Sequence, residues 1–143
     1  MSKRFRYLFL FLLVVLVSIG FTASVWAAQV TIKFSIWDYA MTVDYKEIIA
    51  NFQQENPDIK VEVIDTASAQ YPDKMTVILA AGDDVDVYAV KDFSSYSRYL
   101  SSNYLEPLDK YLKKDKIDMK PYGLAVNAVK SKGKLMAFPY RSD

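Results

Sequence analysis

The sequence predicts an α/β fold in which a mainly parallel sheet is flanked by helices. Apolar residues that alternate or run continuously at 30–37, 59–64 and 85–90 predict three strands. Between these segments, apolar residues recur at spacings of three and four, which is typical of amphipathic helices. Strands that are separated by helices favour parallel pairing through right-handed crossovers.

Two apolar periods define the first strand and the first helix. In the strand every second residue is apolar: Val30, Ile32, Phe34 and Ile36. The helical positions then follow the i, i+3, i+4, i+7 pattern: Tyr45, Ile48, Ile49 and Phe52. Asp44 and Glu47 predict a capping-box-like start of this helix, and Pro57 predicts its end.

The second strand, 59–64, also alternates polar and apolar residues. Because strands that are covered on both faces are usually apolar throughout, this pattern favours an edge strand. A second helix is expected to begin near Pro72 and to end at Gly82, the residue types that favour these two positions.

Weaker periodicities predict short helices beyond the third strand. Their apolar positions are Phe93, Tyr96 and Leu100, then Leu108, Tyr111 and Leu112, then Tyr122, Ala125, Val126 and Val129. Residues 131–133 predict a turn and 135–140 a last strand. No terminal helix or polar tail follows before Asp143, so we expect the sequence to be a fragment of a longer fold.

The first 27 residues have the pattern of a secretory signal peptide. Lys3, Arg4 and Arg6 precede fifteen uncharged, mostly apolar residues at 7–21, and small residues follow near Ala27. The alternative is an uncleaved membrane anchor, but fifteen residues are fewer than the ~20 that span a bilayer. The predicted organisation is therefore a signal peptide at 1–27, cleaved after Ala27, and one domain at 28–143 that is periplasmic or secreted.

Composition excludes several classes of function. Without the leader, the chain has fifteen Lys and Arg against seventeen Asp and Glu, a net charge of −2 that gives no sign of nucleic-acid binding. The absence of Cys excludes disulfides and a lipid-modified cysteine, so composition leaves an uncleaved leader as the expected contact with a membrane. The absence of His excludes histidine triads and imidazole zinc sites.

No motif points to an enzyme, a cofactor or a metal. GxSxG, Walker A and GxGxxG patterns are missing, and the adjacent Asp83 and Asp84 give no evidence of the separated carboxylates of a glycosidase. With Asp86 they invite a calcium interpretation, but the spacing is not that of an EF-hand loop. We therefore expect no catalytic residues, no cofactor and no metal.

Candidate ligand-binding residues follow from the rule that open parallel sheets bind ligands beyond the carboxyl ends of their strands. The first strand supplies Trp37, Asp38 and Tyr39, and the third supplies Lys91 and Asp92. Tyr140, Arg141 and Asp143 join them if the last strand is also parallel. Carboxylates that accept hydrogen bonds from hydroxyls, together with aromatic faces that cover C–H surfaces, are suited to a sugar.

Structural roles compete with binding at these positions. Trp37 could close the core, Asp38 could cap the turn after it, and Asp92 could be the N-cap of the following helix. Tyr71 and Tyr122 are expected in the core or half-buried at the surface.

Several segments, in order, resemble one known family. They are 30–37 (VTIKFSIW), 48–61 (IIANFQQENPDIKV), 80–83 (AAGD) with 85–87 (VDV), 105–109 (LEPLD) and 133–139 (GKLMAFP). The set is similar to the extracellular solute-binding proteins of ABC importers, in the maltose-binding-like, sugar-binding branch. The sequence departs from it where the family often has Pro, at Asp84 or Val85, and in lacking the lipidated Cys of Gram-positive members.

The resemblance implies a type II periplasmic-binding-protein fold, two α/β lobes that close on a ligand, of which this chain supplies part of the N-terminal lobe. It also implies that Asp38, Asp92 and Asp143 occupy positions that sugar-binding relatives use.

The function expected from the resemblance is capture of a sugar or oligosaccharide for import, with ABC permease subunits as partners and without catalysis. The alternatives are a membrane-anchored extracellular sensor or adaptor domain, and a binding protein for a non-sugar solute.

Overall fold

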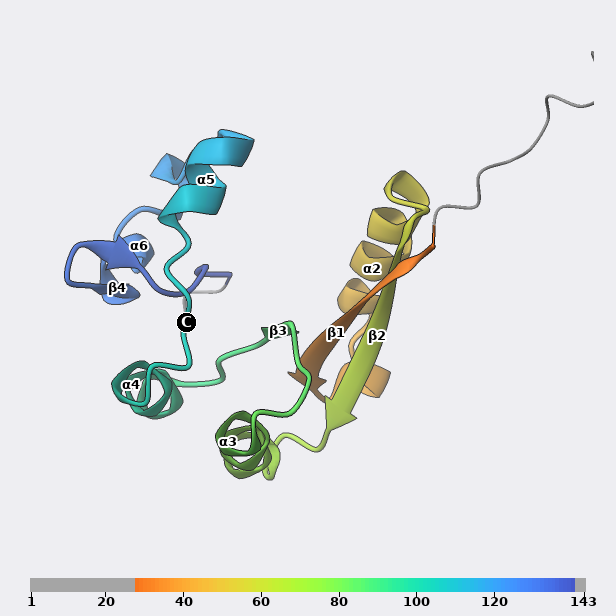
Figure 1. Cartoon of the computed structure of the whole chain (residues 1–143), viewed down its shortest axis with the longest axis horizontal. Helices are drawn as coiled ribbons and strands as arrows, with labels where there is room; N and C mark the ends of the chain where they lie inside the picture. The colour runs from red at the N-terminus through yellow and green to blue at the C-terminus, as the bar shows by residue number, and fades with distance from the viewer. Residues whose placement is uncertain (1–27, 141–143) are drawn as a thin grey trace, which may run out of the picture.

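The computed structural model describes residues 28–140, which form two sheets and several helices (Figure 1). The first half of the described chain contains β1 (Val30–Trp37), the 3-10 helix η1 (Tyr39–Met41), α2 (Val43–Glu55), β2 (Ile59–Thr66), α3 (Tyr71–Ala81) and β3 (Val87–Tyr88). The second half contains α4 (Phe93–Ser101), α5 (Asp109–Asp115), η2 (Lys120–Tyr122), α6 (Ala125–Ala128), β4 (Lys130–Ser131) and β5 (Lys134–Leu135).

The main sheet has the strand order β2-β1-β3, and both neighbours of β1 run parallel to it. β1 pairs with β2 over its full length, from Val30 opposite Ile59 to Trp37 opposite Thr66. The predicted α/β class with a mainly parallel sheet is confirmed, and β2 lies at an edge of the described sheet as its polar alternation indicated. Parallel pairing brings the carboxyl ends of all three strands to the same edge.

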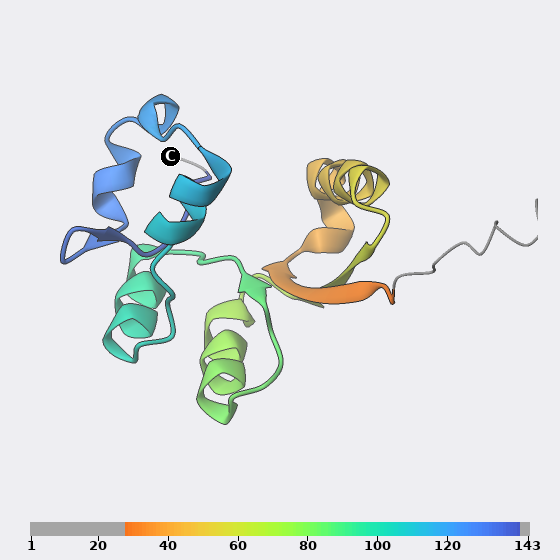
Figure 2. The same ribbon diagram turned by 45° about the horizontal axis from the view of Figure 1, so that its top comes forward.

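The two faces of β1 pack against different helices. Figure 2 shows α2 on one side of the sheet and α3 on the other. On the α2 side, the rings of Phe34 and Tyr45 lie 6.3 Å apart. On the α3 side, the hydroxyl of the buried Ser35 donates to Met75 Sδ at 3.1 Å. The alternating sequence of β1 therefore becomes buried on both faces only toward its carboxyl end, where α3 covers it.

The core lies between α3, α4 and the ends of β1 and β3. Its buried members are Tyr71, Met75 and Tyr99. Partly buried residues surround them: Trp37, Ile78, Leu79, Tyr88, Val90, Tyr104 and Leu105. Many of these are tyrosines, whose rings provide apolar area and whose hydroxyls reach backbone carbonyls. Tyr88, for example, donates to the carbonyl oxygen of Tyr104 at 2.7 Å, and burial raises its pKa to about 12.

Tyr71 links β1 to the segment after β3. Its hydroxyl lies 2.9 Å from the carbonyl oxygen of Ser35 and 2.8 Å from that of Ala89. The side chain is 1% exposed, and this burial raises the pKa of the phenol well above its usual range. Tyr71 is thus a core residue, one of the two alternatives that the sequence left open.

The helix boundaries show which capping signals operate. α3 has Pro72 in its first turn and ends at Gly82, which adopts φ +69° as predicted. The predicted capping box of α2 is wrong. The helix begins after Thr42, whose hydroxyl donates to the carbonyl of Asp38 at 3.0 Å and does not cap the helix.

β3 is shorter than the predicted strand at 85–90. Its ladder covers only Val87 and Tyr88, although the N–H groups of Asp86 and Ala89 also donate to carbonyls of β1. Before β3 the Asp86 carboxylate accepts from the N–H of Lys33 at 2.8 Å, so a side chain occupies the place of a backbone partner. Asp84 forms an ion pair with Lys33 at 2.7 Å.

Two predictions for the second half are wrong in detail. The predicted helix through Tyr122 and Val129 is split into η2 and α6 because Gly123 adopts φ +52° and ψ −130°, outside the helical region. The predicted strand 135–140 is reduced to β5, which pairs with β4 in an antiparallel hairpin outside the main sheet. Pro139 lies in the part that does not pair, and proline has no N–H to donate to a ladder.

The predicted signal peptide at 1–27 lies outside the described residues. Within 28–140, no helix is long and apolar enough to cross a bilayer.

Replacing Tyr71 with Phe should lower the free energy of unfolding by about 1–3 kcal/mol, because the buried carbonyl of Ser35 and the partly buried carbonyl of Ala89 lose their shared donor. Urea denaturation followed by circular dichroism measures this loss. Tyr111→Phe is the matched control, since Tyr111 is 46% exposed and its variant should unfold within about 0.5 kcal/mol of the unmodified chain. Equal stability of the two variants would contradict this role of Tyr71.

Candidate functional site

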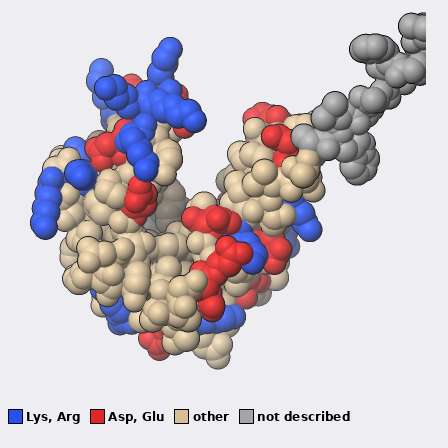
Figure 3. Space-filling view, viewed as in Figure 1, with Lys and Arg blue, Asp and Glu red and all other residues tan. Residues whose placement is uncertain are grey.

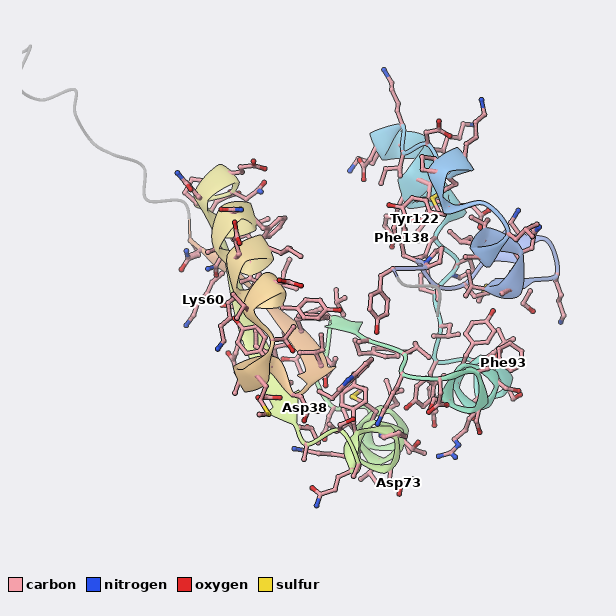
Figure 4. The ribbon with its side chains drawn as sticks, turned by 180° about the vertical axis from the view of Figure 1, so that it is seen from behind. Asp38, Lys60, Asp73, Phe93, Tyr122 and Phe138 are labelled. Carbon is pink, nitrogen blue, oxygen red and sulfur yellow. The ribbon has the colours of Figure 1, made fainter. Side chains whose placement is uncertain are left out.

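The candidate site is the edge of the main sheet where β1, β2 and β3 end. We call it the strand-end rim and define it by Trp37, Asp38, Ser68, Lys91 and Asp92. Asp38 is seen at the end of β1 nearest α3 (Figure 4). The rim lies at the carboxyl edge of a parallel sheet, the place that the strand rule selects.

Asp38 is held in an unusual backbone conformation by contacts on both sides. Its φ of 51° and ψ of 32° are in the left-handed region, which Asp tolerates better than most residues. Its N–H donates to the carbonyl of Thr66 at 3.1 Å, and its Oδ1 accepts from the N–H of Ser68 at 2.9 Å. The side chain therefore spans from β1 to the loop after β2 and does not cap η1.

Lys91 is tied to the same loop from the other side. Its Nζ donates to the carbonyl oxygen of Ser68 at 2.6 Å and to the Ser68 hydroxyl at 2.7 Å. The ammonium also lies 6.0 Å from the centroid of the Trp37 ring, within the range of a cation–π contact. Ser68 thus connects Asp38 to Lys91, and the structure brings together these two predicted site residues.

Trp37 is half-buried and packs on the core. Its ring centroid lies 5.2 Å from that of Tyr71, with the planes tilted by 59°. The ring therefore closes the top of the core, and its contact with Lys91 lies toward the rim.

Asp92 is the N-cap of α4. Its Oδ1 accepts from the N–H of Ser95 at 2.7 Å, and this bond holds the pKa of the carboxyl below its usual value. The residue is exposed and follows Lys91 directly in the chain. The predicted capping role is present, and it leaves the rest of the carboxylate open to solvent.

Tyr39 is the first residue of η1, and its backbone binds Asp65, an acidic residue that the sequence analysis did not select. The N–H groups of Tyr39 and Ala40 donate to the two carboxylate oxygens of Asp65, at 3.0 and 3.1 Å. Lys46 lies 5.9 Å from the centroid of the Tyr39 ring. Asp65 is near the carboxyl end of β2, so the strand rule applied to that strand would have selected it, and Ser68 three residues later.

The third predicted cluster is not placed on the rim by a parallel strand. Tyr140 is 50% exposed and follows the antiparallel hairpin, while Arg141 and Asp143 lie outside the described residues. The neighbouring Phe138 lies with Tyr122 in the part of the molecule formed by the later helices, apart from Asp38 (Figure 4).

Carboxylates elsewhere have structural partners. Asp84 and Asp86 hold Lys33 in the middle of β1, beside the start of β3 and away from the carboxyl end of β1. The hydrogen bond from Lys33 to Asp84 raises the pKa of the lysine. Across the described residues 28–140, no group of three or more His, Cys, Asp or Glu is arranged to hold a metal ion. An open hollow of about 330 Å³ beside α5 is lined by Glu106, Pro107, Asp109, Lys110 and Lys134.

Comparison with known families identifies the protein class. Residues 40–141 match the family described as bacterial extracellular solute-binding protein. The chain belongs to this family. The match begins within η1, so it includes Ser68, Lys91 and Asp92 of the rim, whereas Trp37 and Asp38 lie just before it.

Solved structures of similar fold include proteins whose descriptions name a sugar or a bound oligosaccharide. A sugar transporter from Rhizobium etli in an open conformation is 31% identical, with a TM-score of 0.69, over 74% of this chain and 27% of that one. A substrate-binding protein from Listeria monocytogenes in complex with cycloalternan is 27% identical, with a TM-score of 0.63 and the same coverage.

The sugar-binding protein MalE from Xanthomonas citri, at 23% identity and a TM-score of 0.66, supports the fold alone and is covered over 28% of its length. The chain therefore spans about a quarter of the length of these structures, and the expected type II periplasmic-binding-protein fold is confirmed for that part.

Replacing Asp92 with Ala should lower the free energy of unfolding by about 1 kcal/mol at neutral pH, because the N-cap of α4 is lost. The folded-state pKa of Asp92 is depressed, so its contribution is complete above the unfolded value of about 3.9 and disappears as pH falls through the folded value. Urea unfolding at pH 7 and pH 2 measures the change.

Glu47→Ala is the control, because Glu47 is exposed and α2 has no side-chain cap. Its variant should unfold like the unmodified chain at both pH values. A loss for Asp92→Ala that is undiminished at pH 2 would argue against the charged cap.

Proposed function

We propose that this solute-binding protein captures a carbohydrate outside the cytoplasm and delivers it to the permease of an ABC importer, without chemistry on the sugar. The observation that carries the proposal is the rim, where a carboxylate, an ammonium and an indole ring are held together at the carboxyl edge of the sheet. The family match and the sugar-binding descriptions of the solved relatives support it.

Asp38 is the proposed hydrogen-bond acceptor for sugar hydroxyls. Only its Oδ1 accepts a hydrogen bond from the described residues, so Oδ2 is available to a ligand. Asp92 is exposed beyond its capping bond and is the second proposed acceptor. A charged acceptor gives stronger hydrogen bonds than a neutral one, which suits a ligand that presents many hydroxyls.

Trp37, Tyr39 and Lys91 are proposed to shape the rim as much as to contact the sugar. Two of the three donors of Lys91 are directed at Ser68, and Trp37 packs on Tyr71. The ligand would be enclosed by a second lobe, as the resemblance implies, and closure would be favoured by contacts that exist only in the closed state. Asp143 remains a proposed ligand residue on the strength of the resemblance, and Tyr140 and Arg141 remain proposed only as its neighbours in the sequence, because the last strand is not a parallel strand of the main sheet.

The full-length protein should melt at a higher temperature in the presence of its sugar, because a ligand that binds only the folded state stabilises it. A thermal-shift panel of mono- and oligosaccharides, amino acids and polyamines identifies the class. Sugar turnover, detected as product, would refute a purely binding role, and a shift only with amino acids or polyamines would refute the carbohydrate assignment.

Asp38→Asn should weaken sugar affinity by about ten- to a hundredfold, because hydrogen bonds to a charged acceptor contribute about 1.5–3 kcal/mol. Calorimetric titration of the full-length protein measures the change. Asp58→Asn is the control, since Asp58 lies before β2 at the opposite edge of the sheet. Equal affinities of the two variants would remove Asp38 from the site.

Export should leave a protein that begins at Ala28, because the small residue Ala27 is the expected cleavage signal. N-terminal sequencing of the exported protein tests this, and Ala27→Lys should block processing. An intact Met1 on the unmodified protein would instead support the membrane-anchored sensor or adaptor.

A further inference from the structure

Charge is divided unevenly along the described chain. Residues 28–108 contain six Lys and Arg against thirteen Asp and Glu, whereas residues 109–140 contain eight Lys against three Asp. The space-filling view shows the result on one face, with lysines gathered over the α5 part of the molecule and carboxylates prominent on the side of the main sheet (Figure 3). The molecule is therefore electrically polarised, although its net charge is small.

The basic side is concentrated on α5 and η2. We call Lys113, Lys114, Lys116 and Lys120 the lysine face. All four are exposed, and none forms an ion pair with another described residue. Lys110 is left out because its Nζ is paired with Glu106 at 2.7 Å.

Exposed apolar side chains accompany these lysines. Tyr111 is 46% exposed and Ile117 is 44% exposed, and both come from the same short segment as the lysine face. Lysines mixed with exposed aromatic and aliphatic residues are typical of surfaces that lie at the boundary of a lipid bilayer.

We propose that the lysine face docks on an anionic phospholipid surface. Clusters of four or more basic residues bind such surfaces by long-range attraction. The negative lipid surface would repel the acidic side of the main sheet while it attracts the lysine face, so its electric field would orient the molecule. Lysine, a strongly hydrated point charge, suits a fluid array of headgroups better than a rigid two-pronged contact, for which arginine is preferred.

The proposal adds a membrane contact to the two expected from the sequence, docking on the permease, which the resemblance implies, and an uncleaved leader. It does not depend on the identity of the solute, because the lysine face belongs to elements other than those of the rim.

The test is co-sedimentation of the full chain with vesicles of phosphatidylcholine alone or with phosphatidylglycerol added. Residues 1–27 are the same in every variant, so the readout is the gain in binding that phosphatidylglycerol produces. Lys113→Gln/Lys114→Gln should reduce this gain by about tenfold or more, from the two charges lost. The control Lys60→Gln/Lys74→Gln removes two exposed lysines from the acidic half, and Figure 4 places Lys60 on the side of the main sheet.

The proposal is supported if the α5 variant alone loses the gain in binding that phosphatidylglycerol produces. It also expects 0.5 M salt to reduce this gain toward zero for the unmodified chain. Equal losses for both double variants would reduce the effect to net charge and overturn it, as would binding that phosphatidylglycerol does not increase. Salt-sensitive self-association on size exclusion that the α5 variant abolishes would overturn it too, because the lysine face would then bind the acidic half of a second copy. Sugar-induced thermal shifts of the same variants should be unchanged, which separates this test from that of the proposed function.

Discussion

The structure depends on the burial of Tyr71 between β1 and the segment that follows β3. One hydroxyl lies within hydrogen-bond distance of carbonyls from both, at Ser35 and Ala89, while its ring supports Trp37 at the top of the core. Because β3 pairs with β1 over only two residues, this side-chain link supplements a short ladder. The position of Lys91 and Asp92 relative to Asp38 depends on that link.

The rim is built by side chains that bind the backbone of a neighbouring loop. Asp38 accepts from Ser68, Lys91 donates to Ser68, and Asp65 accepts from the two residues that begin η1. Each bond satisfies a polar group near the end of a strand, where a neighbouring strand no longer supplies a hydrogen-bond partner. Residues of the rim therefore have a structural role whether or not a ligand is present, and capping and ligand binding are compatible at Asp92.

The polar organisation extends beyond the rim. Among the described residues, five carboxylates of the sheet half bind backbone N–H groups or Lys33: Asp38, Asp65, Asp84, Asp86 and Asp92. The lysine face on α5 and η2, in contrast, is exposed to solvent. Residues 109–140 therefore attract anions, whereas residues 28–108 carry an excess of negative charge. The proposed ligand site at the rim and the proposed membrane contact on α5 and η2 belong to different elements, so the two could act independently.

Local sequence patterns were sufficient for β1, α3 and α4, and for the parallel α/β class. β1 has an unbroken period of two, α3 has Pro72 and Gly82 at its ends, and α4 has Asp92 as its cap. These signals act within a few residues and do not require a partner. The tertiary structure decided the rest: the Asp86 side chain shortened β3, Gly123 divided the last predicted helix, and Ser68 emerged as the link between Asp38 and Lys91. The contacts of Asp86 and Ser68 join residues more than twenty positions apart, so no local period encodes them, and only the folded chain brings their atoms within hydrogen-bond distance. The break at Gly123 is a local backbone conformation that the apolar periodicity does not reveal.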